Sequence, residues 1–205
     1  MSTELQSDSG PDDALLARLA TGDEAAFTSL FRRRQGDVYR VALLMTGSPA
    51  AAEDVTQDVF LAVMRDAGRY ETGRSSVKAW LCGIARNHAR RRLERDGRNV
   101  PLVEDADSET PAVAVRPDPV EDLANTQRVD ALRRAIMNLP LRYREVVVLC
   151  DLEEISYADA AEALGCAVGT VRSRLHRARA LLAAKMRAVL PSPDSGRTRI
   201  SRCLA

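Results

Sequence analysis

Residues 154–187 read EISYADAAEALGCAVGTVRSRLHRARALLAAKMR, and this stretch predicts a helix-turn-helix. Ser156 is placed to cap a first helix, and Asp159, three positions later, completes a capping box. Gly165 suits the left-handed conformation that often ends a helix. A second helix is expected to start near Val168, so two helices are joined by a tight turn.

The second of these helices has one apolar stripe and is otherwise basic. The stripe consists of Val171, Leu175, Ala178 and Leu182, which recur with the helical period. The basic residues are Arg172, Arg174, Arg177, Arg179, Lys185 and Arg187. A basic helix face alone is usually just solvated. Combined with the cap, the glycine turn and an amphipathic partner helix, it favours a recognition helix for the DNA major groove.

Composition places the whole chain in the all-α class. The 205 residues are 45% hydrophobic with only 11 glycines and 9 prolines, and strand-like alternation is nearly absent. No run of 18 apolar residues occurs, and the polar, acidic N-terminus does not resemble a secretory signal, so we expect a cytoplasmic protein.

The net charge of +1 conceals a strong segregation. Residues 99–122 hold one basic and seven acidic residues, and they separate two basic blocks. The same stretch lacks a helical period and contains Pro101, Pro111, Pro117 and Pro119. We therefore expect two small helical domains, a flexible acidic linker between them and a disordered basic tail. The predicted bounds are 12–96, 97–121, 122–190 and 191–205.

Capping signals mark the helices of the first domain. Helix starts are expected at Asp12 or Asp13, at Asp23, at Ser48 followed by Pro49, and at Ser76. Residues 68–76 are expected to form a loop. In the second domain, a helix from about Leu141 to Cys150 should lead into the helix-turn-helix.

Two further groups of residues in the first domain carry possible function. Asp54, Gln57 and Asp58 share one polar helix face, which on its own is most simply a solvated surface. Trp80 precedes a cluster made of Arg86, Arg90, Arg91 and Arg92. An aromatic beside arginines suits a surface that stacks unpaired bases and neutralises phosphates, while the alternative for Trp80 is a core aromatic.

Nothing in the sequence indicates an active site, a metal or a cofactor. The four cysteines, Cys82, Cys150, Cys166 and Cys203, show neither CxxC spacing nor a neighbouring histidine pair. No nucleophile or metal-ligand cluster appears, so an enzyme is not expected. Two rival hypotheses remain: a stand-alone helix-turn-helix regulator, and a redox switch or enzyme built on the cysteines.

The order of motifs resembles the bacterial extracytoplasmic-function sigma factors of RNA polymerase. The resemblance rests on AEDVTQDVFL, on VKAWLCGIARNHARRR after a loop, and on LPLRYREVVVLCDLEEISYADAAEALGCAVGTVRSRLHRARALL after an acidic linker. It implies a sigma region 2 domain and a sigma region 4 domain. It also implies a protein that binds the clamp and flap regions of the polymerase core and directs promoter-specific initiation.

The resemblance assigns roles to single positions. Asp54, Gln57 and Asp58 match residues that grip the polymerase clamp. Asn87, Arg90 and Arg91, with the 68–76 loop, match the part that reads the −10 element and holds a flipped-out base. Trp80 is assigned to the same surface because an aromatic ring can stack an unpaired base. The positions that face the −35 element are Arg172, Ser173, His176 and Arg177, and Thr170 at the helix start is placed to donate to a phosphate.

The family also implies promoter DNA and an anti-sigma factor as partners, with no small-molecule substrate. Three positions depart from the family pattern. The family usually has an aromatic where this chain has Cys82, often a basic residue at Gly83, and often a serine at Ala167. Glycine inside a helix costs about 1 kcal/mol relative to alanine, so a looser base-contacting surface is expected.

Overall fold

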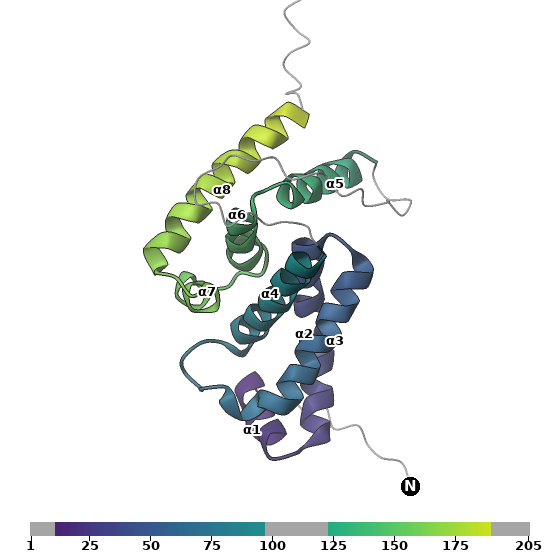
Figure 1. Cartoon of the computed structure of the whole chain (residues 1–205), viewed down its shortest axis with the longest axis vertical. Helices are drawn as coiled ribbons and strands as arrows, with labels where there is room; N and C mark the ends of the chain where they lie inside the picture. Colours follow the sequence, from purple (N-terminus) through teal and green to yellow (C-terminus); the bar gives the residue numbers. More distant parts are fainter. Residues whose placement is uncertain (1–10, 97–122, 190–205) are drawn as a thin grey trace, which may run out of the picture.

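The computed structural model describes residues 11–96 and 123–189, with side chains at 11–96 and 129–187. All regular structure in those ranges is helical, which confirms the all-α prediction. The elements are α1 (Asp12–Ala20), α2 (Glu24–Thr46), α3 (Pro49–Asp66), η1 (Ala67–Arg69), α4 (Val77–Arg95), α5 (Leu123–Met137), α6 (Leu141–Val146), η2 (Val147–Leu152), α7 (Tyr157–Leu164) and α8 (Val168–Val189). Figure 1 shows α1–α4 as one bundle and α5–α8 as another.

Three of the predicted helix caps are confirmed. The Asp23 carboxylate accepts hydrogen bonds from the backbone amides of Ala25 and Ala26. Ser48 and Ser76 cap α3 and α4 in the same way, and Pro49 occupies the first turn of α3. Each cap satisfies amides that a helix leaves without an internal partner, so local sequence alone fixes these starts.

The predicted cap of α1 is wrong. The residue before the helix is Pro11, and Asp12 lies inside the first turn with only 8% of its surface exposed. Its carboxylate instead binds the guanidinium groups of Arg33 and Arg34 on α2. Ion pairs with two arginine side chains across the bundle take the place of the expected bond to a helix amide.

Helix α3 packs against α2 and α4 to form the core of the first bundle. Val55, Val59 and Val63 lie on one stripe of α3 and are almost fully buried. Beside them Phe60 meets the ring of Phe31 edge-on, with the ring centroids 4.7 Å apart. This core leaves the opposite, polar face of α3 in solvent.

The helix predicted from Leu141 to Cys150 is longer and changes type. It is α-helical only to Val146 and then continues as the π-helix η2 to Leu152. Just beyond it, Glu154 adopts a φ of +55°, the one positive value among the described non-glycine residues. A π-turn holds more residues than an α-turn, so η2 shifts the register of the residues that lead into α7.

The two bundles lie in direct contact, with α4 against α7 (Figure 1). Among the described residues, none of the helices is long and apolar enough to cross a membrane. The predicted acidic linker at 97–121 and the predicted tail at 191–205 lie outside the described residues.

Candidate nucleic-acid and polymerase interfaces

The helix-turn-helix forms as the sequence predicts. The Ser156 hydroxyl accepts a hydrogen bond from the Asp159 amide at 3.1 Å, and Gly165 ends α7 with a φ of +63°. Val171, Leu175 and Ala178 of α8 are buried against the rest of the second bundle. The buried stripe of α8 turns its basic residues outward.

Four of the five residues predicted to face the −35 element lie exposed on α8. They are Arg172, Ser173, His176 and Arg177, while Thr170 is half-buried at the start of the helix. The Ser173 hydroxyl donates to the Thr170 carbonyl at 3.0 Å. Within the described residues, no ion pair engages Arg172 or Arg177, so their guanidinium groups are available to an anion.

Arg179, on the same helix, already has an ion-pair partner. Two of its nitrogens contact the Asp151 carboxylate, at 2.5 and 3.0 Å. This hydrogen bond raises the pKa of Arg179. The basic helix is therefore not uniform, because Arg179 is already neutralised by its own domain.

The polar face of α3 is exposed, but it is not free of partners. Asp54 lies 3.0 Å from Arg92 of α4, and Asp58 lies 3.6 Å from Nδ1 of His88. Both carboxylates remain more than half exposed, at 59% and 52%. Gln57 between them is also exposed. An incoming basic group can reach both carboxylates only by competing with α4.

An apolar groove beside this face escaped the sequence analysis. Helices α2 and α3 enclose a volume of about 690 Å³, which reaches Gln57 on the polar face. Its apolar lining is Phe27, Phe31, Tyr39, Phe60, Leu61 and Met64. Leu61 and Met64 are 49% and 54% exposed, which is high for such side chains. In the sequence, Leu61 and Met64 do not belong to the buried valine stripe of α3, and this spacing was the signal that could have predicted their exposure.

Trp80 is half-buried. It therefore lies between the two alternatives that the sequence left open, an exposed residue that stacks unpaired bases and a core aromatic. Its ring leans on Tyr70 with the centroids 5.4 Å apart. The Tyr70 hydroxyl lies 2.6 Å from a carboxylate oxygen of Asp13 and 2.8 Å from the Ser75 carbonyl. Burial, together with the Asp13 contact, raises the pKa of Tyr70. The aromatic pair therefore anchors the loop that precedes α4.

The arginine cluster of α4 is mostly neutralised by the protein itself. Arg86 binds Glu145 of the second bundle at 2.5 Å, and Arg90 binds Glu94 at 3.0 Å. Together with the Arg92 pair, these contacts leave Arg91 as the cluster's exposed cation without a described ion-pair partner. Fewer arginines of this cluster are thus free to bind phosphates than the sequence predicts.

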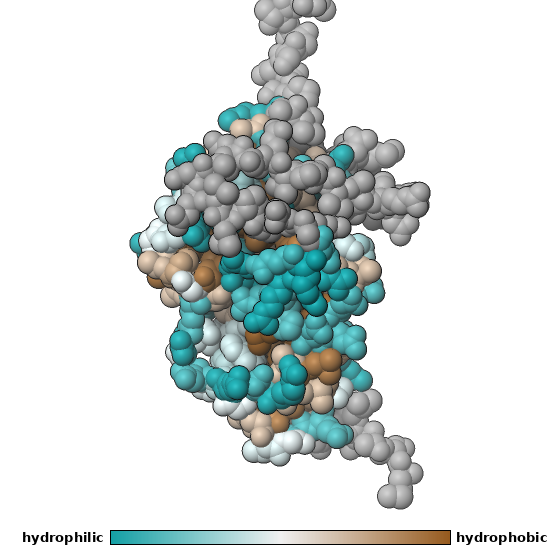
Figure 2. Space-filling view, viewed as in Figure 1, coloured by the Kyte–Doolittle hydropathy of each residue, from teal (hydrophilic) through white to brown (hydrophobic). Residues whose placement is uncertain are grey.

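Asn87 lies exposed on α4 beside this cluster. Its side-chain oxygen accepts a hydrogen bond from Arg86 at 2.9 Å. Of the residues predicted to read the −10 element, Asn87 and Arg91 are exposed, while Trp80 and Arg90 are partly covered. Hydrophilic residues gather over this part of the surface in Figure 2.

The departures at Cys82 and Gly83 have a structural cause. Cys82 is fully buried, and a Cβ added at Gly83 would stand 3.2 Å from the Cβ of Ala163 on α7. A side chain at 83 would therefore require Ala163 to move away by a few tenths of an ångström. The glycine lets α4 and α7 approach closely, while the looser base-contacting surface stays a prediction.

The cysteines that the structure describes behave as packing residues. Burial raises the pKa of Cys82 to about 12 and that of Cys150 to about 11. At neutral pH such thiols hold almost no thiolate, the reactive form. Within the described ranges, no group of three histidine, cysteine or acidic side chains is placed to hold a metal ion.

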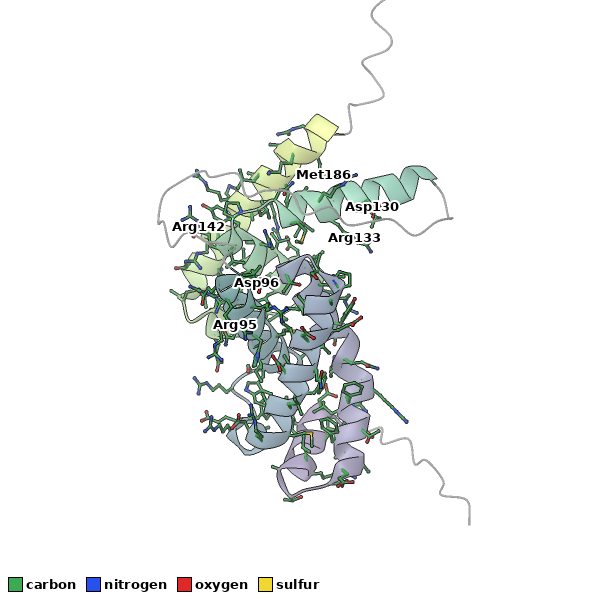
Figure 3. All side chains as sticks on the ribbon, turned by 45° about the vertical axis from the view of Figure 1, so that its right-hand side comes forward. Arg95, Asp96, Asp130, Arg133, Arg142 and Met186 are labelled. Carbon is green, nitrogen blue, oxygen red and sulfur yellow. The ribbon has the colours of Figure 1, made fainter. Side chains whose placement is uncertain are left out.

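Figure 3 labels residues of both bundles. Arg95 and Asp96 close the first bundle at the end of α4, and Asp130 and Arg133 lie on α5 of the second. Arg133 contacts Asp130 at 3.5 Å along the helix. In the order of the described helices, the candidate DNA-reading helix of each bundle, α4 or α8, comes last in that bundle.

A capped helix-turn-helix with a basic recognition helix, next to a second helical domain with an exposed polar face, defines a DNA-binding transcription protein. Comparison with family models specifies which kind. Residues 30–99 match sigma-70 region 2, and residues 130–182 match sigma-70 region 4. The chain therefore belongs to the sigma-70 family of RNA polymerase sigma factors, in its extracytoplasmic-function group.

Similar proteins carry the same family name. The chain is 38% identical over 179 residues to the ECF RNA polymerase sigma factor SigM of Mycobacterium tuberculosis, covering 84% of this chain and 83% of that protein. It is 39% identical over 166 residues to ECF RNA polymerase sigma factor SigE of Mycolicibacterium smegmatis. That match covers 78% of this chain but only 62% of the length of the relative.

A solved structure supports the same conclusion. It is the sigma factor RpoE in complex with the anti-sigma factor NepR from Bartonella quintana. The match has a TM-score of 0.62 at 28% sequence identity and covers 78% of this chain and 96% of that one. The two-domain fold predicted from the sequence is therefore confirmed.

Proposed function

We propose that this protein binds the RNA polymerase core, directs it to promoters with −10 and −35 elements, and helps to melt them. The first described bundle acts as region 2 and the second as region 4, within the predicted bounds 12–96 and 122–190. The acidic segment at 97–121 joins them as a tether. The protein catalyses no reaction itself and needs no cofactor.

One observation carries this proposal: a polar partner face and a free basic recognition face occur in the same chain. On α8, Arg172 and Arg177 are exposed and uncommitted, which suits guanine edges or phosphates. On α3, the carboxylates of Asp54 and Asp58 are exposed beside Gln57. A stand-alone regulator has no need of that second face.

The core-binding surface is proposed to include the groove as well as the polar face. Gln57 belongs to both, and Leu61 and Met64 present apolar area next to it. Protein interfaces commonly combine a desolvated apolar centre with a polar rim. Asp54, Gln57 and Asp58 then form the rim that receives basic side chains of the polymerase clamp. Region 4 in turn contacts the polymerase flap.

On α4, Asn87 and Arg91 are proposed to contact the melted −10 strand, with Trp80 and Arg90 at the edge of that surface. Thr170, Ser173 and His176 join the arginines of α8 at the −35 element. The protein is proposed to act in the cytoplasm and at the nucleoid when bound to polymerase, under the control of an anti-sigma factor. RpoE and its partner NepR are the precedent among the similar structures.

The test is pull-down with purified core polymerase, and then run-off transcription on genomic fragments. Core binding and initiation at a defined set of start sites are expected. Sequence-specific binding to DNA without any affinity for core polymerase would favour the stand-alone regulator. Retained DNA binding and transcription after all four cysteines are changed to serine would eliminate the redox-switch alternative.

A further inference from the structure

Helices α3 and α4 are linked by two charged contacts on the surface of the first bundle. The Asp54 carboxylate of α3 lies 3.0 Å from Nη1 of Arg92 on α4. Asp58, one turn further along α3, lies 3.6 Å from Nδ1 of His88. His88 and Arg92 are also one turn apart, so the two contacts follow each other along the facing sides of the helices. Both carboxylates belong to the face that is proposed to bind the polymerase clamp.

A neighbouring stripe of α4 is open to solvent. Asn87, Arg91 and Arg95 recur every four residues and are all exposed, and Figure 3 labels Arg95 near the end of this helix. Among the described residues, neither Arg91 nor Arg95 has an ion-pair partner. Each residue of an α-helix turns the chain by about 100°, so Arg92 projects from the side next to Arg91. Its long side chain can therefore extend to α3 or to the stripe that is proposed to contact the melted −10 strand.

The internally paired arginines of α4 differ in where their partners lie. Arg86 binds Glu145 of the second bundle, and the two side chains are only 11% and 4% exposed. Arg90 pairs within its own helix. Arg92 is different, because the Asp54 carboxylate that holds it is 59% exposed and lies on the proposed clamp-binding face. An incoming basic group of the polymerase therefore competes directly with Arg92 for its partner.

We infer that Arg92 is a further DNA-binding residue with two exclusive partners, the Asp54 carboxylate in the free protein and a phosphate of the melted strand in the polymerase complex. This inference rests on the proposed function. When a basic side chain of the clamp takes the Asp54 carboxylate, the Arg92 guanidinium loses this partner and turns to the adjacent phosphate. Because each binding event removes a competitor of the other, core binding and strand binding strengthen each other reciprocally.

The chemistry of the Arg92 pair suits such an exchange. The Arg92 side chain is 34% exposed, so water and salt screen its attraction to Asp54 and the pair is weak. Asp96 of the same helix is a second acceptor, 3.3 Å from Nε and 40% exposed. A phosphate offers the planar guanidinium two parallel hydrogen bonds, whereas Asp54 accepts one. Exposed side chains change rotamer within nanoseconds, so the exchange needs no movement of either helix.

The test uses the free, full-length protein and a fluorescent single-stranded oligothymidylate, because phosphate contacts carry no sequence information. All proteins carry Arg172→Ala and Arg177→Ala, which weaken competing binding at α8. Asp54→Asn should raise the affinity for the strand by about two- to fivefold, as the range for exposed ion pairs allows. One added phosphate contact should also steepen the plot of log affinity against log salt by about 0.7. Fluorescence anisotropy over a series of salt concentrations measures both.

Two further variants separate the exchange from a general change in charge. Glu53→Gln removes the same charge from an exposed position of α3 without a described ion-pair partner, so it should match the parent protein. Asp54→Asn combined with Arg92→Gln should match Arg92→Gln alone in both affinity and salt slope, because contacting residues are not additive. Thermal unfolding checks that each variant is folded.

Three results would overturn the inference. The first is an unchanged affinity and salt slope in Asp54→Asn. The second is the same gain from Glu53→Gln as from Asp54→Asn. The third is a gain from Asp54→Asn that persists when Arg92 is replaced.

Pull-down with core polymerase separates this inference from the proposed function. A protein that shows the Arg92-dependent gain but never binds core refutes the proposed function and leaves the exchange of Asp54 for phosphate standing. A protein that binds core but shows no such gain keeps the proposed function and refutes the exchange.

Discussion

Arg92 extends from α4 to place its guanidinium 3.0 Å from the Asp54 carboxylate on α3. The carboxylate is 59% exposed and the guanidinium 34% exposed, so solvent screens the pair. Exposed pairs of this kind contribute about 0.2–1 kcal/mol. The proposed clamp-binding face is therefore held ready by a weak internal cation that a basic partner can displace.

Freeing that carboxylate should tighten the complex with polymerase. Arg92→Gln removes the internal competitor, and the affinity for core polymerase should rise by up to about fivefold, as the range for exposed pairs allows. Asp54→Ala with Gln57→Ala should weaken binding instead. A fluorescence titration with core polymerase measures both, with Asp151→Ala as the charge-matched control. Unchanged affinity in the Asp54 and Gln57 double variant would contradict the assignment of this face.

Two arginines of the recognition helix should behave differently. Arg177→Ala should cost about 1–3 kcal/mol of discrimination at one base pair of the −35 element if the side chain reads a base. Arg179→Ala should cost far less, because Asp151 already holds that guanidinium. Binding of each variant to a set of single-base promoter variants gives the answer. An equal loss on every sequence would make Arg177 a phosphate contact.

Asn87 should help to melt the promoter by capturing an unpaired base. Asn87→Ala is expected to impair open-complex formation more on a duplex promoter than on one melted in advance, because capturing a flipped base helps to drive melting. Stacking and base capture are worth about 1–3 kcal/mol per base. Permanganate footprinting on the two templates measures this difference. Equal, wild-type levels of open complex on both would exclude Asn87 from the melted strand.

The buried Cys82 thiol should resist alkylation. Burial raises its pKa to about 12, above the ordinary value of 9.0, so the thiolate is lost as the pH falls below about 12. At pH 8 only roughly 10⁻⁴ of the thiol is then ionised. Mass spectrometry after iodoacetamide treatment should find Cys82 unmodified in the native protein and modified in urea. Rapid modification of the native protein would revive a redox role.

Removing the Arg144 guanidinium should destabilise the protein. The group is buried, and burial lowers its pKa to about 10. It donates to the carbonyls of Met45, Met137 and Leu139, and Arg144→Ala would leave all three without this donor. A loss of about 3 kcal/mol in the free energy of unfolding is expected. Urea unfolding measures it, with the exposed Arg133→Ala, expected within about 0.5 kcal/mol of wild type, as control.

Local signals predicted the elements well because their causes are local. Ser76 and Asp23 cap helices through amides two or three residues away, and Gly165 ends α7 by its own backbone conformation. The recognition face of α8 was also predictable, since a buried stripe fixes which residues point outward. These features need no knowledge of any distant part of the chain.

The errors come from partners far away in the sequence. The sequence predicts that Arg86 is a cation for DNA, yet Glu145, 59 residues later, already binds it. The sequence predicts a helix cap at Asp12 or Asp13, yet two arginines of α2 bind the Asp12 carboxylate. The π-helix was missed because its apolar residues fit an α-helical pattern equally well. For Arg86 and Asp12, a tertiary contact decided the outcome over a plausible local interpretation.

The position of Glu153 depends on the number of residues in the π-helix η2, which directly precedes it. Each residue of an α-helix turns the chain by about 100°, and a π-turn accommodates one residue more than an α-turn. Losing a single residue between Val147 and Leu152 would let the segment relax to an α-helix and rotate Glu153 away from Arg40. A relative with one residue fewer here would therefore keep both Arg40 and Glu153 and still lack the ion pair that joins them in this protein.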